Sequence, residues 1–264
     1  MASSRPKRST SRWSSAAAAS LLALTTLGAL AEPKRSGFDD MSASTQAMQR
    51  DDVQNPGMLA AGQGEALWNA QPPGGGQSCA SCHGDATASM KGVAARYPAF
   101  DEATRRPIDL QDRIRACNAR RPGAPDMPHE SEELVALSAY VGLQSRGTPT
   151  APDPDPRLAP FRARGQALFE RPIGQLNLSC AACHDARAGG RLAGALIPQG
   201  HPNGYPLYRL EWQGMGSLQR RLRNCMTGVR AEAPPFGAPD FVELELYLQS
   251  RAAPLAVETP AVRP

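Results

Sequence analysis

The stretch SCAACHD, from Ser179 to Asp185, contains two cysteines separated by two residues and followed directly by a histidine. One short helical turn presents all three side chains at this spacing. Two such thiols can form thioether bonds with a haem, and the adjacent histidine can reach its iron. The stretch therefore predicts a covalent haem c site made by Cys180, Cys183 and His184.

The same pattern occurs earlier in the chain, within a longer repeat. GEALWNAQPPGGGQSCASCHG begins at Gly64 and GQALFERPIGQLNLSCAACHD begins at Gly165, so the motif residues recur 101 positions later. Downstream, RIRAC ends at Cys117 and RLRNC ends at Cys225. Repetition at a fixed period indicates a duplicated unit, and two such motifs favour two haem c groups over disulfides or zinc. The earlier motif supplies the corresponding haem-binding residues, Cys79, Cys82 and His83.

The N-terminus has the features of a secretory signal peptide. Four basic residues precede an apolar stretch that ends in Ala29-Leu30-Ala31 and is too short to span a bilayer comfortably. We expect export to the periplasm and cleavage near Ala31, which removes residues 1–31. Of the 29 basic residues, 25 then remain against 25 acidic ones. This balance gives no reason to expect nucleic-acid binding, and the mature chain has no other candidate membrane span.

The remaining sequence divides into an extension and two tandem units. Residues 32–63 have no counterpart before the second unit, so we interpret them as an N-terminal extension packed over the surface. The units span residues 64–146 and 161–264. Residues 147–160 between them alternate prolines and aspartates, which sustain neither a helix nor a sheet ladder, and are expected to form a linker.

Apolar periodicity predicts helices and gives no long alternating strand. SEELVALSAYVGLQ begins at Ser131, a suitable N-cap, and places Leu134, Leu137 and Val141 on one face. In the second unit Asp240 and Glu243 suit a capping box at the start of an apolar stripe from Phe241 to Leu248. Small helices joined by loops and completed by haem are typical of cytochrome c. We therefore predict an all-α, loop-rich fold of two tandem cytochrome c-like domains related by internal duplication.

Each iron also needs a sixth ligand, and the residues leave this choice open. Cys117 and Cys225 each follow their own haem motif within the repeated R-x-R-x-C pattern, which favours thiolate ligands. Met127 follows His83 in a proline-rich loop and offers the methionine ligand of most small electron carriers. A disulfide between the two cysteines is a further alternative. Met127 has no methionine counterpart in the second copy. The other candidates are Met41, Met48, Met58, Met90, Met215, Met226, His129 and His201, and neither histidine is repeated.

The residues around Cys225 resemble the dihaem SoxA family of the SoxAX cytochromes, the L-cysteine S-thiosulfotransferases of bacterial thiosulfate oxidation. The resemblance covers essentially the whole mature chain, and RLRNCMTGVR, which starts at Arg221, is its most specific part. It implies that His83 and Cys117 are the axial ligands of the first haem, and His184 and Cys225 those of the second. It also implies that Cys225 is the catalytic residue, present as a persulfide, and that Arg221 binds the substrate.

This resemblance implies an enzyme that couples thiosulfate oxidatively to a cysteine of a sulfur-carrier protein and passes two electrons to a partner cytochrome c. The implied partners are a monohaem SoxX-like subunit, which forms a heterodimer with the chain, and a SoxYZ-like carrier. Two alternatives come from the residues alone. One is a plain dihaem electron-transfer cytochrome c, which methionine ligation would favour, and the other is a dihaem peroxidase that uses His129 or His201.

Overall fold

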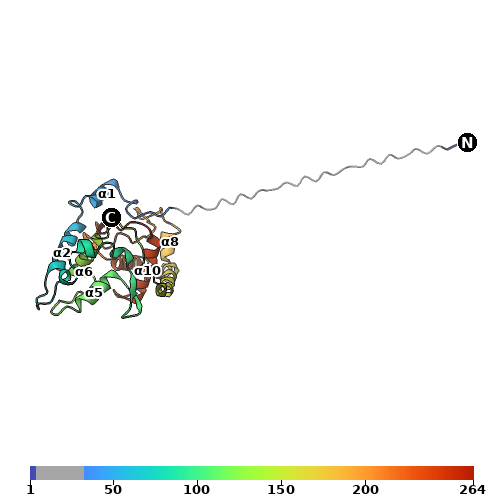
Figure 1. Cartoon of the computed structure of the whole chain (residues 1–264). Coiled ribbons are helices and arrows are strands. Elements are labelled where there is room, and N and C mark those ends of the chain that lie inside the picture. Colours follow the sequence, from blue (N-terminus) through green and yellow to red (C-terminus); the bar gives the residue numbers. More distant parts are fainter. Residues whose placement is uncertain (4–32) are drawn as a thin grey trace. The chain divides into compact units, whose positions relative to one another are not determined.

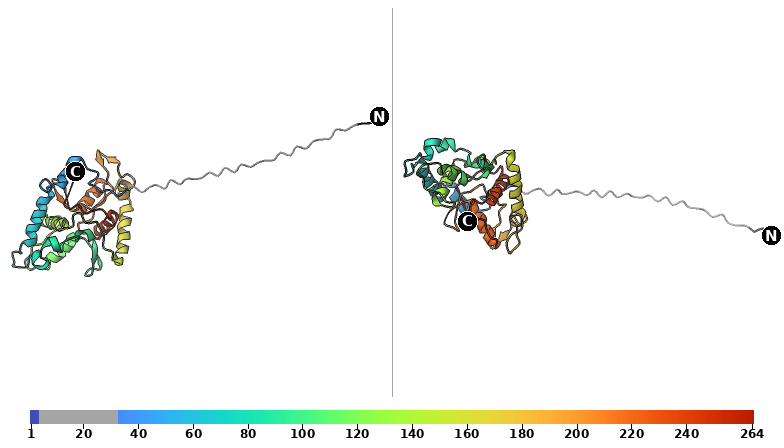
Figure 2. Two further views of the ribbon diagram at one scale, coloured as in Figure 1. Left: turned by 45° about the horizontal axis from the view of Figure 1, so that its top comes forward. Right: turned by 90° about the horizontal axis from the view of Figure 1, so that it is seen from below.

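Two pairs of packed helices, one pair in each half of the chain, form the framework (Figure 1). In the first half α2 (Gly57–Asn69) packs against α6 (Glu132–Leu143). In the second half α7 (Ala159–Glu170) packs against α10 (Pro239–Ala252). Figure 2 shows α2, in blue, and α7, in yellow, at opposite sides of the unit formed by residues 34–264.

The structure is a computed structural model that describes residues 1–3 and 33–264. The predicted signal peptide, residues 1–31, therefore lies almost wholly outside the described residues. Among those described, no helix is both long enough and apolar enough to cross a membrane.

A glycine at the same place in each helix pair allows close contact between the two backbones. A Cβ atom on Gly64 of α2 would lie 2.1 Å from the carbonyl oxygen of Ala136 in α6. A Cβ atom on Gly165 of α7 would lie 2.0 Å from the carbonyl oxygen of Glu243 in α10. Only glycine fits at these two positions, and both stand first in the repeated segments.

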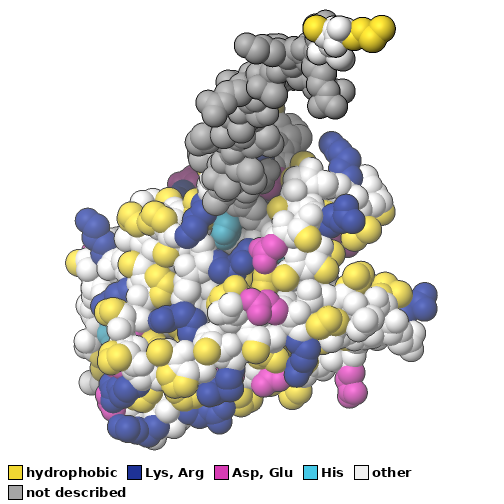
Figure 3. Space-filling model, turned by 90° about the vertical axis from the view of Figure 1, so that its right-hand side faces the viewer, with side chains coloured by type: hydrophobic (Ala, Val, Ile, Leu, Met, Phe, Trp, Pro, Cys, Tyr) yellow, Lys and Arg dark blue, Asp and Glu magenta, His cyan; other side chains and the backbone are white. Residues whose placement is uncertain are grey.

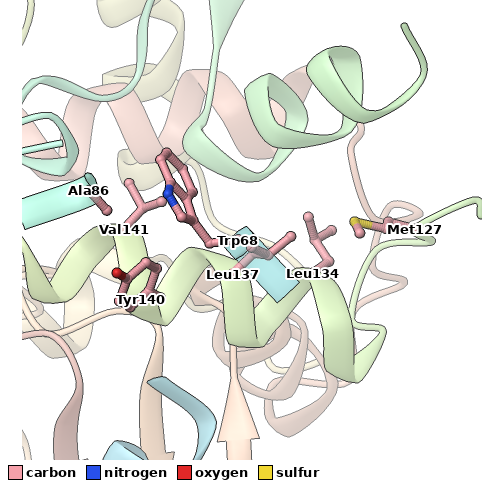
Figure 4. Close-up of a cluster of buried hydrophobic side chains, with 7 residues drawn as sticks. All are labelled: Trp68, Ala86, Met127, Leu134, Leu137, Tyr140 and Val141. Atoms are coloured by element: carbon pink, nitrogen blue, oxygen red, sulfur yellow. The ribbon is translucent and has the colours of Figure 1, made fainter. Parts of the chain in front are cut away.

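Each helix pair carries its own apolar cluster. In the first half the cluster contains Trp68 of α2 and runs along α6 through Leu134, Leu137 and Tyr140, with Met127 at one end (Figure 4). In the second half Phe169 takes the place of Trp68 and lies with three buried leucines, Leu218, Leu244 and Leu248. Burial of these side chains provides the hydrophobic stabilisation of each half.

The predicted helix that follows Ser131 is confirmed, whereas the predicted capping box in the second unit is wrong. Ser131 is the N-cap of α6, and its side chain accepts a hydrogen bond from the backbone of Leu134. In α10 the N-cap is Ala238, which has no side chain able to cap, because Pro239 already supplies the first helical residue. Glu243 is buried and instead accepts hydrogen bonds from Arg164.

The all-α prediction holds for the framework but misses three small β-sheets among the described residues. Two are hairpins, β1 (Ala99–Asp101) with β2 (Arg106–Ile108) and β3 (Arg191–Leu192) with β4 (Ala195–Leu196). The third has the order β6-β5-β7 and consists of β5 (Leu207–Arg209), β6 (Gly214–Gly216) and β7 (Ala261–Arg263). Strands of two or three residues are too short to show an alternating pattern.

The other helices include the segments that carry the cysteines. They are α3 (Cys79–His83), α5 (Leu110–Asn118), α8 (Cys180–His184) and α9 (Leu218–Gly228). The remaining short ones are α1 (Ala43–Arg50), α4 (Ala86–Ser89), η1 (Ala94–Arg96) and η2 (Pro156–Leu158).

The segments outside the helix pairs join the ends of the chain to the two halves. In the predicted N-terminal extension α1 packs against β7, and the side-chain amide of Asn55 donates to the carbonyl oxygen of Pro260 at 2.9 Å. In the predicted linker Thr150 donates its backbone N–H to Leu255, and Asp153 accepts from the backbone of Phe100. Both segments thus connect parts of the chain that are distant in sequence.

Candidate active site

The two C-x-x-C-H motifs form two five-residue helices, α3 and α8. Ser78 and Ser179 stand at the N-caps. Their side chains accept hydrogen bonds from the backbone N–H groups of Ser81 and Ala182, which directly precede the second cysteine of each motif. The sequence prediction that one helical turn carries both cysteines and the histidine is therefore confirmed in both halves.

The ring of His184 is held in an orientation suited to a metal ligand. Its Nδ1 atom lies 2.8 Å from the carbonyl oxygen of Pro198. Gly200, at φ +74°, lies so close to the ring that a Cβ atom there would be 2.9 Å from Cγ of His184. A hydrogen bond at Nδ1 fixes the tautomer and leaves Nε2 available for iron.

Each later cysteine lies beside its own haem motif. Cys117 on α5 acts electrostatically on Cys79, and Cys225 on α9 acts on Cys180. Burial, followed by the charge of Cys225, raises the pKa of Cys180 to about 11. All six cysteines are free thiols, so the predicted alternative of a Cys117–Cys225 disulfide is wrong.

Neighbouring groups stabilise the thiolate of Cys225. Burial alone would raise its pKa, but a hydrogen bond with the side chain of His184 and the charges of Arg221 and Arg209 outweigh it, so that the pKa is lowered. The helix α9 places Arg221 one turn before Cys225, as the sequence predicted. A thiolate and a guanidinium therefore lie together beside the second motif.

The arginines of α9 differ in their partners. Arg220 donates to the carbonyl oxygen of Met215 at 3.0 Å and lies over the ring of Trp212. Arg223 donates to the carbonyl oxygen of Pro234. Arg221 forms no ion pair with any acidic side chain of residues 33–264. Its charge is thus available to an anion next to Cys225.

Two residues near Cys225 were not found from the sequence. Burial raises the pKa of Tyr205 to about 12, and the charges of Arg221, Arg209 and Cys225 also act on this pKa. Neither Tyr205 nor Arg209 belongs to a haem motif, and β5, which brings Arg209 to the site, is only three residues long. No local pattern around them predicted their position.

The alternative ligands occupy different environments. Met127 is buried in the apolar cluster of the first motif, so it remains a competitor of Cys117 for the first iron. His129 is hydrogen-bonded to Asp112 at 2.8 Å. His201 lies 3.1 Å from the carbonyl oxygen of Arg35, and burial lowers its pKa to about 4. Both histidines already have partners, which argues against them as iron ligands or peroxidase acid–base groups.

The residues present fit a covalent haem c in each half. Each motif faces an apolar cluster, with Cys79 packed against the first and Cys180 against the second. A haem requires such apolar walls, two free thiols and an oriented histidine. On the face shown in Figure 3, Lys and Arg side chains are spread among Asp and Glu side chains.

Comparison with known proteins gives consistent matches. Residues 63–150 match the family model SoxA/TsdA, cytochrome c domain. The chain is 40% identical over 229 residues to the L-cysteine S-thiosulfotransferase subunit SoxA of Pseudaminobacter salicylatoxidans, which covers 86% of this chain and 80% of the relative. The Paracoccus pantotrophus subunit of the same name is 37% identical, covering 86% of this chain and 78% of the relative.

A solved structure also matches across both halves. It is the crystal structure of SoxXA from P. pantotrophus, with a TM-score of 0.83 and 36% sequence identity, covering 88% of this chain and 87% of the matched chain. The similarity therefore extends to the arrangement of the elements and includes the second half, which the family model does not reach.

Proposed function

The chain belongs to the SoxA family of L-cysteine S-thiosulfotransferase subunits, and on this premise we propose that it joins thiosulfate oxidatively to a cysteine of a sulfur-carrier protein. The observation that carries the proposal is the placement of Arg221 one helical turn before Cys225, beside His184. The guanidinium of Arg221, which forms no ion pair within residues 33–264, can bind the thiosulfate dianion, and the Cys225 thiol, whose pKa is lowered, can react with its sulfur. A plain electron-transfer cytochrome c needs neither, so the transferase is favoured.

Both halves are proposed to hold a covalent haem c. Cys79 and Cys82 would attach the first haem by thioether bonds, with His83 and Cys117 as its axial ligands. Cys180 and Cys183 would attach the second, with His184 and Cys225 as its axial ligands. When bound, the haem irons accept electrons one at a time and pass them on. The chain's own contribution is orientation, since Pro198 fixes the ring of His184 and the walls of each cluster exclude water.

Cys225 is the proposed nucleophile. Joining its thiol to the outer sulfur of thiosulfate forms one S–S bond and releases one proton and two electrons. The two electrons pass to the partner cytochrome. A carrier thiolate then attacks the sulfur bonded to Cys225 and takes the thiosulfonate group, and Cys225 leaves as a thiolate. A persulfide on Cys225 adds one sulfur between the protein and the substrate without changing this balance. Arg221 neutralises part of the dianion's charge throughout.

Membership of the SoxA family indicates the proposed partners. The similar P. pantotrophus structure is a SoxXA complex, which supports a monohaem SoxX-like subunit as the other half of a heterodimer. A SoxYZ-like protein would present the acceptor cysteine. The location would be the periplasm, after cleavage of the signal peptide near Ala31.

The domain organisation is part of the proposal. Residues 64–146 and 161–264 would be two copies of one cytochrome c-like unit, separated by the linker at 147–160 and preceded by the extension at 32–63. The matching glycine contacts, clusters and motif helices of the two halves support an origin by internal duplication.

The test uses the haem-loaded complex with its monohaem partner, thiosulfate and a carrier protein that presents one thiol. Wild-type protein should reduce an added cytochrome c only when both thiosulfate and the carrier are present. Cys225→Ala should lose this turnover while a pyridine haemochrome assay still finds both haems attached. Turnover retained by Cys225→Ala would remove Cys225 as the nucleophile, and wild-type reduction without thiosulfate would return the protein to the electron carriers.

A further inference from the structure

In the first half of the chain, an arginine of α5 is neutralised by an acid at the end of β1. The Nη2 atom of Arg113 lies 2.7 Å from Oδ1 of Asp101. Asp101 is only 5% exposed and also accepts two hydrogen bonds from Thr104. This ion pair neutralises Arg113, which lies one helical turn before Cys117 on α5.

The second half has the same arrangement, except that an arginine stands where the first half has an aspartate. β5 corresponds to β1, and each strand forms a hairpin with the strand that follows it. Arg221 and Cys225 have the same spacing on α9 as Arg113 and Cys117 on α5. At the end of the strand, where the first half has Asp101, the second half has Arg209. Two guanidinium groups therefore replace an ion pair.

Both arginines of this second pair lie close enough to Cys225 for their charges to act on it. The charges of Arg221 and Arg209 act on Cys225 and on Tyr205 alike. Arg209 has an ion pair with Glu211 at 2.8 Å, but the two ends differ in exposure: the side chain of Arg209 is 16% exposed and that of Glu211 is 62% exposed. An exposed carboxylate is a weak and readily displaced partner. A buried anion can thus take its place.

We propose that Arg209 is a second substrate-binding residue, which holds the sulfonate end of thiosulfate together with Arg221 and so directs its outer sulfur at Cys225. This inference rests on the proposed function. Two guanidinium forks match three sulfonate oxygens and a charge of two better than one fork does. In the first half the corresponding place is taken by Asp101, which is already paired with Arg113.

The test compares Arg209→Gln with Arg171→Gln, which removes an equal charge from the exposed C-cap of α7 in the same half. Sodium thiosulfate is titrated into each haem-loaded complex without carrier protein, and binding is followed by the low-temperature EPR signal of the second haem. KM and kcat are then measured with saturating carrier. Arg209→Gln should raise both the Kd and the KM for thiosulfate about tenfold or more, with a smaller effect on kcat, and Arg171→Gln should change neither.

Two further variants guard against a folding defect. Arg209→Lys keeps the charge and should recover part of the affinity. Arg209→Asp recreates the ion pair of the first half, where an aspartate at this place is compatible with the fold, and should weaken binding more than Arg209→Gln does. Unchanged Kd and KM in Arg209→Gln would overturn the inference.

The experiments distinguish failure of the proposed function from failure of this inference. If wild-type protein binds thiosulfate but shows no turnover with carrier thiol, the transferase proposal is wrong, while the titration still decides the role of Arg209. If wild-type protein turns over and Arg209→Gln behaves like Arg171→Gln, only Arg209 is removed from the site.

Discussion

Gln219 of α9 donates its side-chain amide to the carboxylate of Asp109 at 2.8 Å, and this bond joins the two helices that carry Cys225 and Cys117. Asp109 is the N-cap of α5, and Gln219 lies in the first turn of α9. Both are buried, at 4% and 1% exposure. The carbonyl oxygen of the Gln219 side chain accepts from the backbone N–H of Gly237, also at 2.8 Å. The active-site helix is thus anchored in the first half of the chain.

Replacement of Gln219 by Leu should destabilise the protein by about 1–3 kcal/mol, because it leaves a buried carboxyl without its donor. Thermal unfolding followed by circular dichroism measures this loss. The matched control is Gln63→Leu, an exposed position of α2. Equal melting temperatures for the two variants would show that the bond does not stabilise the junction.

The stability of the junction should fall as pH rises. Burial, followed by the charge of Asp112, raises the pKa of Asp109 from 3.8 to about 6, and burial with the charge of Asp109 raises that of Glu245 well above its usual value. Between about pH 4 and pH 6 the folded state therefore binds more protons than the unfolded state. The stabilisation is complete below about pH 4 and is lost as the pH rises through 6 and above. Glu245→Gln should flatten the pH dependence of the unfolding free energy. A wild-type profile that rises over this range would contradict the assignment.

The two corresponding arginines should respond differently to truncation. Arg221→Ala should raise the KM for thiosulfate by about 10- to 100-fold, since a charge-assisted hydrogen bond contributes about 1.5–3 kcal/mol. Arg113→Ala should leave KM unchanged but lower the melting temperature, because it strands the buried carboxylate of Asp101. Steady-state kinetics and thermal unfolding of both variants separate binding from stability. An unchanged KM in Arg221→Ala would place this residue outside the pocket.

The low-temperature EPR spectrum should identify the sixth ligand of each iron. We expect low-spin thiolate-type signals from both haems in the oxidised protein. Cys117→Ser should remove one of these signals, and Met127→Leu should leave both unchanged, because Met127 is expected only to fill the apolar cluster. Loss of a signal in Met127→Leu would instead make this methionine the ligand of the first haem.

Much of the candidate site followed from local spacing. Both C-x-x-C-H motifs form the expected helical turn, Ser131 caps the expected helix, and Arg221 precedes Cys225 by one turn of α9. These features involve residues within one turn of each other, where backbone geometry alone fixes which side chains meet. The misplaced cap of α10 shows the limit, since Pro239 moved the start of that helix by a residue or two.

The sequence by itself determined the motifs, the repeat and the pairing of each later cysteine with its own haem motif. Only the tertiary structure decided which of the two corresponding arginines, Arg113 or Arg221, is paired with an acid. Asp101 forms an ion pair with Arg113, and Arg209 stands at the corresponding place in the second half; each lies on a strand of three residues, twelve positions before the arginine of the helix. Contacts of this kind depend on how a hairpin folds back against a helix, and short-range periodicity carries no information about them.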